Sequence, residues 1–253
     1  MKKLFIKNRK DQNISVIIEN ENWNWWLVFV IHGLWDDKNS LHIIEYAKPF
    51  LDNDFVVVRF DTTNTFWESD WNFENATLTN YYEDLEDVII WSSSQNFYKE
   101  KFILIWHSLW AICSALYSQI NNSKVLSLIM VSSPINFDLS KTTYSIEELK
   151  NWQETWVLIE DWGNFKVKLK WNYMEDKKKY DLLKNTENFI MPILMIAWEN
   201  DNTTPYKHQK MLFDKIQSRK EIYVIKNWPH TFWEKIHLDE IKMLLSKWIA
   251  SLE

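Results

Sequence analysis

The balance between tryptophan and glycine is the feature that most limits how this chain can fold. It has 17 tryptophans and only 2 glycines in 253 residues, whereas an average composition would give about 18 glycines. Tryptophan and glycine together therefore match the number expected of glycine alone. Because tight turns and close backbone contacts need glycine, we expect that many of the tryptophans stand at glycine positions.

The segment Ile105–Ala111 shows this most clearly. Its letters are I-W-H-S-L-W-A, and glycine at Trp106 and Trp110 would turn them into I-G-H-S-L-G-A. The pattern G-x-S-x-G is typical of a sharp strand-to-helix turn that presents a nucleophilic serine. Small residues flank that serine because the strand and the helix pass close together there.

We therefore hypothesise an alternative genetic code, in which UGA codons that the source cell reads as glycine are shown here as tryptophan. An indole beside the serine would overpack the turn, at about 1–3 kcal/mol per site, against about 5–15 kcal/mol for the stability of a whole domain. Trp91 and Trp248 lie on apolar helix faces and fit as genuine tryptophans, whereas Trp152 and Trp162 are ambiguous. The alternative is a tryptophan-rich binding module whose indoles stack on sugars, but that function gives no reason for glycine to be missing.

Composition and charge narrow the class of protein. The net charge of −6 argues against nucleic acid as a partner, and 46% hydrophobic residues allow a sizeable core. No apolar run reaches the roughly 18 residues of a membrane span, and the N-terminus lacks the apolar stretch of a signal peptide. The lone cysteine, Cys113, is typical of a reducing compartment. We expect a cytoplasmic protein, and the sequence leaves its oligomeric state open.

Short apolar runs alternate with longer segments of helical spacing, which predicts an α/β fold with a mostly parallel sheet flanked by helices. An N-terminal hairpin is expected over Lys3–Lys7 and Ile14–Glu19. The expected buried strands are Leu27–Ile31, Phe55–Phe60, Phe102–Ile105, Val125–Val131, Ile193–Ala197 and Glu221–Ile225. The expected helices are Leu41–Leu51, Thr79–Ser94, Leu109–Ile120, Tyr206–Gln217 and Lys235–Ser251.

Residues 135–190 interrupt this alternation. A structureless loop of that length is uncommon in a compact domain, so we predict a small helical cap over the active site. The cap would be an insertion between the core segments 1–134 and 191–253. Six lysines of the insertion are expected to be solvated surface rather than a substrate patch: Lys166, Lys168, Lys170, Lys177, Lys178 and Lys179.

The order of polar residues after the strands predicts a catalytic triad of Ser108, Asp201 and His230. Ser108 follows one predicted strand, and Asp201 and His230 follow two later strands, in the chain order serine, acid, histidine. The serine would attack a carbonyl, the histidine would move the proton, and the aspartate would orient the histidine. Glu199 is the competing carboxylate in the same loop as Asp201. The other histidines are expected to have surface or packing roles: His32, His42, His107, His208 and His237.

Two backbone N–H groups are expected to stabilise the oxyanion. One belongs to Leu109, directly after the predicted nucleophile, and the other to Leu34, which follows Gly33 in the loop after an early strand. The chain has neither zinc-finger nor H-E-x-x-H spacing. We therefore expect neither a metal nor a cofactor.

These motifs resemble the serine α/β-hydrolase superfamily, within the group of cinnamoyl (feruloyl) esterases, monoacylglycerol lipases and serine aminopeptidase-like hydrolases. With glycine at the tryptophans, the stretches Val57–Asp61 and Trp67–Asn75 resemble the segment before the nucleophile in small bacterial cinnamoyl-esterase-like enzymes. The resemblance runs from about residue 25 to the C-terminus and is weakest over 135–190. It implies a cofactor-free hydrolase with the α/β-hydrolase fold and the triad named above.

The expected function is the hydrolysis of small-molecule carboxylic esters with small or medium acyl groups, through an acyl-enzyme. Two alternatives remain: an amide or thioester hydrolase with the same triad, either aminopeptidase-like or a thioesterase, and a catalytically silent binding protein with this fold. Residues Asn64–Phe66 depart from the G-H or close variant that is usual in these families. The preference for acyl and alcohol groups is therefore open.

Overall fold

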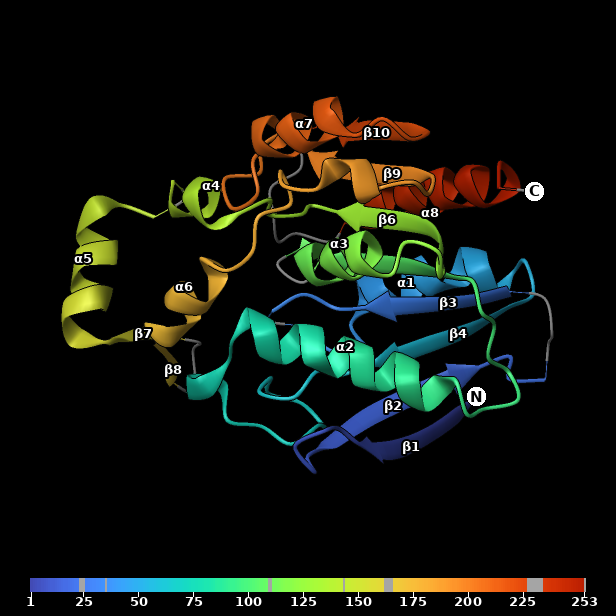
Figure 1. The fold of residues 1–253 in the computed structure, drawn as a ribbon, viewed down its shortest axis with the longest axis horizontal. Helices are drawn as coiled ribbons and strands as arrows, with labels where there is room; N and C mark the ends of the chain where they lie inside the picture. The colour runs from blue at the N-terminus through green and yellow to red at the C-terminus, as the bar shows by residue number, and fades with distance from the viewer. Residues whose placement is uncertain are drawn as a thin grey trace.

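The computed structural model describes residues 1–22, 26–34, 36–108, 111–142, 144–161, 166–226 and 234–252. Within these ranges an eight-stranded sheet forms the centre of the molecule (Figure 1). Its strand order is β1-β2-β4-β3-β5-β6-β9-β10. The strands are β1 (Lys2–Lys7), β2 (Asn13–Glu19), β3 (Trp26–Ile31), β4 (Phe55–Phe60), β5 (Phe102–His107), β6 (Val125–Val131), β9 (Ile193–Trp198) and β10 (Lys220–Ile225).

All neighbours from β4 to β10 pair in parallel, whereas β1 with β2 and β2 with β4 pair antiparallel. The predicted mostly parallel sheet and its N-terminal hairpin are thus confirmed. The central strands were predictable because a parallel strand covered on both faces is apolar along its whole length. In β4 and β5 every residue is buried.

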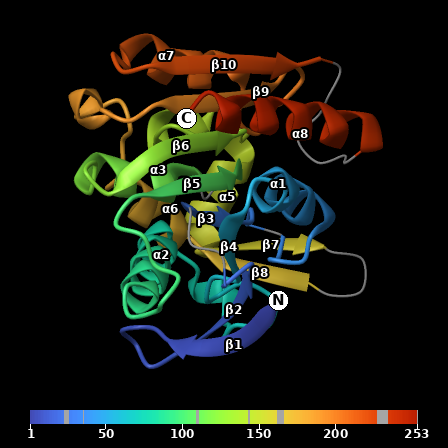
Figure 2. The same ribbon diagram turned by 90° about the vertical axis from the view of Figure 1, so that its right-hand side faces the viewer.

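Helices cover both faces of the sheet, as the turned view in Figure 2 shows. Side chains alternate along a strand, so that Ile103 and Ile105 of β5 join the core on one face while Leu104 and Trp106 join the core on the other. The first face is covered by α1 (Leu41–Leu51) and α8 (Lys235–Ala250), and the second by α2 (Leu78–Ser92), α3 (Ala111–Ile120) and α7 (Tyr206–Lys215).

The packing of α2 against α3 encloses the only cysteine of the chain. Cys113 on α3 has no exposed surface, and its Sγ lies 3.8 Å from the carbonyl oxygen of Leu78 on α2. Burial, with the nearby charges of Asp176 and Asp84, raises the pKa of this thiol well above its ordinary value. Cys113 is therefore a structural thiol.

Residues 144–177 of the segment 135–190 lie beyond the carboxyl ends of the parallel strands, and residues 182–190 return along the end of α3 to the start of β9 (Figure 1). The segment contains α4 (Phe137–Lys141), α5 (Ile146–Thr155), α6 (Asn172–Lys177) and the 3-10 helix η3 (Thr186–Asn188); a further 3-10 helix, η1 (Phe73–Asn75), precedes α2. The segment 135–190 also contains an antiparallel pair of strands, β7 (Val157–Asp161) with β8 (Lys166–Lys170), which the sequence analysis does not predict. The alternation K-V-K-L-K in β8 is a strand pattern, with Val167 and Leu169 buried.

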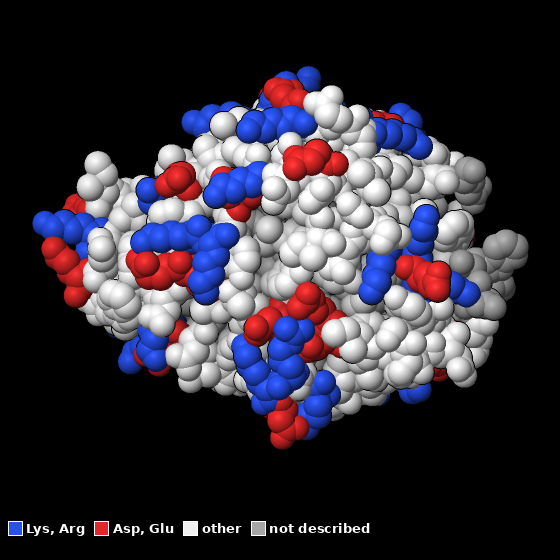
Figure 3. All heavy atoms as spheres, viewed as in Figure 1, with Lys and Arg blue, Asp and Glu red and all other residues white. Residues whose placement is uncertain are grey.

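One prediction for the cap lysines is wrong. Lys177 is only 4% exposed, and its Nζ lies 5.3 Å from the centre of the Tyr173 ring. Burial lowers the pKa of Lys177 to about 8. By contrast, Lys178 and Lys179 are surface groups paired with Glu175 and Asp176 on the same helix. Basic and acidic groups likewise stand side by side on the face seen in Figure 3.

Helix α5 has well-defined ends. It begins with a capping box in which Ser145 and Glu148 bond each other's backbone N–H groups. It ends at Trp156, whose φ of 63° is left-handed. Trp152 in this helix is 1% exposed, and its indole N–H donates to the Leu169 carbonyl at 3.0 Å. Trp152 therefore holds α5 against β8.

No helix of the described residues is both long enough and apolar enough to cross a membrane.

Candidate active site

Ser108 directly follows β5 and has a strained backbone. Its φ is 58°, and the residue is 7% exposed. A positive φ is uncommon for a residue other than glycine and is typical of functional positions. The next residues, Leu109 and Trp110, lie outside the described residues, and α3 begins at Ala111. Ser108 therefore lies at the turn that joins β5 to α3.

The loop after β3 packs directly against this turn. A Cβ added to Gly33 would lie 3.3 Å from the Cβ of Ser108 and 3.1 Å from Nδ1 of His107. Glycine is therefore needed here for close approach rather than for an unusual φ. The predicted oxyanion donor Leu34 follows in the same loop and is half-buried. The other predicted donor, Leu109, is outside the described residues.

Asp201 lies in the loop after β9 and is 4% exposed. Its Oδ1 accepts the backbone N–H groups of Thr203 at 2.8 Å and Thr204 at 2.7 Å. Its Oδ2 accepts the hydroxyls of Thr204, at 2.7 Å, and of Ser132. Ser132 follows β6, so these bonds tie the carboxylate to two neighbouring strand ends. The competing carboxylate, Glu199, is exposed, which favours Asp201 as the acid.

Ser108 and Asp201 come to the same edge of the sheet. They follow β5 and β9, which are parallel and separated by β6 alone. Neighbouring strands are about 4.8 Å apart, so the two strand ends are roughly 10 Å apart. The predicted histidine, His230, lies between β10 and α8, outside the described residues.

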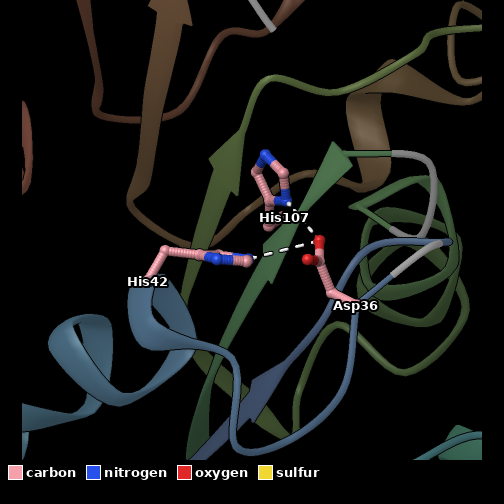
Figure 4. Close-up of side chains that lie close together, drawn as sticks. All are labelled: Asp36, His42 and His107. Carbon is pink, nitrogen blue, oxygen red and sulfur yellow. Dashed lines mark ion pairs between the residues drawn. The ribbon is translucent and has the colours of Figure 1, made fainter. Parts of the chain in front are cut away.

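A carboxylate and two imidazoles, those of Asp36, His42 and His107, meet at the end of β5 (Figure 4). Oδ2 of Asp36 lies 3.3 Å from Nε2 of His42 and 3.7 Å from Nδ1 of His107. The rings of His42 and His107 meet edge to face, with centroids 5.0 Å apart. Burial alone would raise the pKa of Asp36, but the adjacent imidazoles of His107 and His42 outweigh it and hold that pKa well below its usual range.

The sequence analysis missed this cluster because its members come from three separate parts of the chain. Asp36 belongs to the loop after β3, His42 to the first turn of α1, and His107 to the last position of β5. No fixed spacing connects them. The only signal in the sequence was position. Asp36 follows one parallel strand, His107 ends another, and His42 lies at the start of the helix that follows the first strand.

A second buried carboxylate supports the loop after β4. Oδ2 of Asp84 on α2 accepts the backbone N–H and the hydroxyl of Thr63, both at 2.7 Å. Its Oδ1 accepts the amide of Asn8 at 2.9 Å. Burial raises the pKa of Asp84 to about 6, although the hydrogen bonds from Asn8 and Thr63 act in the opposite direction. This network fixes the start of the loop that contains Asn64–Phe66.

A cavity of about 480 Å³ lies where that loop meets the cap. Phe66 and Phe73 stack at its wall with ring centroids 4.6 Å apart. The full lining is Phe66, Trp71, Asn72, Phe73, Glu74, Lys166, Val167 and Lys168. Aromatic side chains of the loop after β4 and of η1 thus lie opposite residues of β8 across this cavity.

The structure accommodates an indole at one flank of Ser108. Trp106 is fully buried, its N–H donates to the carbonyl of His32, and its ring meets Phe60 edge to face at 6.4 Å. Its side chain therefore belongs to the core on the face of the sheet that α2, α3 and α7 cover. The second flank, Trp110, is outside the described residues.

No family model matches the chain, and no curated protein matches it. Solved structures do. Est1E from Butyrivibrio proteoclasticus with ferulic acid bound superposes with a TM-score of 0.85 at 16% identity, covering 98% of each chain. Alpha/beta hydrolase domain-containing protein 10 from mouse gives 0.82 at 16% identity, covering all of both chains. An esterase from Pyrococcus furiosus gives 0.72 at 14% identity, covering 99% of this chain and 90% of the other. These likenesses establish the fold: the chain has the α/β-hydrolase architecture.

Proposed function

We propose that the chain is a serine hydrolase that cleaves carboxylic esters of small or medium acyl groups. The observation that carries the proposal is Ser108, held at a φ of 58° at the end of β5 with the loop of Gly33 against it. In an α/β-hydrolase fold, this is the position of the nucleophile. The esterases among the similar structures support ester substrates.

The proposed reaction has two steps. The Oγ of Ser108 attacks the ester carbonyl while His230 takes its proton, and the alcohol leaves with that proton. Water activated by the same histidine then hydrolyses the acyl-enzyme and restores the serine. Asp201 orients the histidine, and the N–H groups of Leu34 and Leu109 stabilise the oxyanion. The segment 135–190 would cover the substrate as a cap.

A fluorophosphonate probe tests the nucleophile. We expect labelling of the folded protein in which glycine is restored at the proposed positions. In that protein Ser108→Ala should not be labelled, and Ser93→Ala, which alters an exposed serine at the end of α2, should be labelled as before. A folded sample that stays unlabelled would refute the hydrolase proposal and leave the silent binding protein. Ester, thioester and aminoacyl-anilide substrates, assayed side by side, distinguish the three hydrolase classes. Esters of aromatic acids belong in the panel because the similar Est1E structure holds ferulic acid.

The acid side of the rate profile tests His230. Hydrolysis should fall as pH drops through the ordinary imidazole range, about 6.5, because a protonated histidine cannot accept the serine proton. His230→Ala should lose about 10²–10⁴-fold in rate. An unchanged rate in that variant would remove His230 from the mechanism.

We also propose that the native protein has glycine at many tryptophan positions. Trp156 supports this, because of the eight described residues with positive φ other than glycine, seven are Asp, Asn or Ser and only Trp156 is bulky. Trp152 and Trp248 are retained as tryptophan, since each is a buried residue in the interior of a helix, where glycine is unfavourable. The coding DNA and the intact mass of protein from the native host test the proposal. UGG codons at Trp106 and Trp110 would eliminate it.

A further inference from the structure

We propose that Asp36, His42 and His107 bind a divalent transition-metal ion, with Zn²⁺ as the preferred occupant. The proposal is independent of ester hydrolysis, because it uses none of the triad residues. It would add to the chain a site that fastens the loop after β3 to the start of α1 and the end of β5 (Figure 4).

The distances suit a small tetrahedral ion. Zinc binds histidine nitrogen and carboxylate oxygen at about 2.0–2.2 Å, so two ligand atoms of a tetrahedral site are roughly 3.3–3.6 Å apart. The carboxylate oxygen of Asp36 is already 3.3 Å from His42 and 3.7 Å from His107. All three ligand atoms lie within 4.8 Å of one another. Closing the site around an ion therefore needs the two rings to approach by about 1 Å.

The donor set selects the type of metal. Two imidazoles and one carboxylate suit zinc and its neighbours among the transition metals, whereas Mg²⁺ and Ca²⁺ prefer oxygen ligands alone. The side chains of His42 and His107 are 1% and 4% exposed, while that of Asp36 is 26% exposed. The rings are thus held in place by packing, and solvent can reach the site on the carboxylate side to supply a fourth ligand.

Three donor atoms converge on one point: Oδ2 of Asp36, Nε2 of His42 and Nδ1 of His107. An ion at that point would be ligated directly by these atoms. The competing explanation is a carboxylate–imidazole cluster that only joins the loop, helix and strand by hydrogen bonds. The two explanations differ in whether the protein binds metal with defined stoichiometry.

Titration calorimetry of chelator-treated protein with ZnCl₂ tests the site. We expect one ion per chain and a higher unfolding temperature in its presence. Asp36→Asn and His42→Gln should each weaken binding at least about tenfold. Asp37→Asn, which alters the adjacent carboxylate, and His237→Gln, which alters a histidine on α8, should bind as the parent does. The absorption spectrum of bound Co²⁺ gives a second readout, because it reports the coordination geometry.

The outcomes are decisive in both directions. Absence of binding at millimolar Zn²⁺, or equal affinity in Asp36→Asn and His42→Gln with circular dichroism showing both folded, would overturn the site. Ser108→Ala should bind zinc with the parent affinity. Failure of the hydrolase proposal would therefore leave this result untouched, and failure of zinc binding would leave the hydrolase proposal untouched.

Discussion

Trp156 has a left-handed backbone conformation that suits glycine, and about half of its surface is exposed to solvent. The residue closes α5 in the left-handed region and is 48% exposed, with its indole N–H on the side chain of Asn172 at 3.0 Å. Left-handed backbone is unfavourable by about 1–2 kcal/mol for a residue with a Cβ. Glycine removes that strain, and it is the residue most often found after a helix end.

We therefore predict that Trp156→Gly raises the free energy of unfolding by about 1 kcal/mol. The matched variant is Trp152→Gly in the same helix, where loss of a buried indole should lower it by about 3–5 kcal/mol. Urea unfolding of the two variants and the parent measures both values. A loss of stability in Trp156→Gly would show that the indole is a native part of the cap and would weaken the glycine proposal.

Part of the candidate site could be predicted from the sequence. Ser108 and Asp201 could be placed because a parallel sheet brings the residues after its strands to one edge. The cluster of Asp36, His42 and His107 could not, because it depends on the side-chain directions of a loop, a helix start and a strand end. Nothing in the spacing of three such residues fixes those directions.

Among the elements, α2 is joined to the loop after β4 by the buried carboxylate of Asp84. Its pKa is about 6 in the folded protein, against an ordinary value near 3.9. The folded state therefore binds the proton more strongly than the unfolded state does. The stabilisation is fully present below about pH 4 and is lost as pH rises through about 6.

This gives a prediction for the stability of α2 against its neighbours. The free energy of unfolding of the parent, relative to Asp84→Asn, should fall by about 2 kcal/mol between pH 4 and pH 7. Guanidinium unfolding of both proteins across that range measures the difference, and other titrating groups cancel in it. A difference that stays constant with pH would mean that Asp84 keeps its ordinary pKa in the fold.

The elements of the core could be predicted from sequence and those of the cap could not. The strands β3, β4, β5 and β9 are buried along almost their whole length, so each is a short apolar run. The edge strand β10 is only partly buried. In the inserted segment, β8 alternates lysine with valine and leucine, whereas its partner β7 shows no such alternation, so the sequence signal for the pair is weak. Lys177 was placed wrongly for the same reason, since its burial depends on the packing of the cap.

At the scale of the whole molecule, the two sides of the sheet form separate apolar layers, one under α1 and α8 and the other under α2, α3 and α7. The overall architecture was predictable because the order of strands and helices along the chain permits few other arrangements. The division into a core of 1–134 and 191–253 with an insertion at 135–190 stays a prediction.

Because the thiol of Cys113 is enclosed between α2 and α3, its alkylation can report the separation of these two helices. Cys113 has no surface and a raised pKa, so an alkylating reagent can reach it as a thiolate only after the two helices separate. Pulsed iodoacetamide with mass readout should modify the native protein at the rate of that separation, and it should modify urea-unfolded protein at once. Rapid alkylation under native conditions would mean that this half of the molecule opens far more often than its packing indicates.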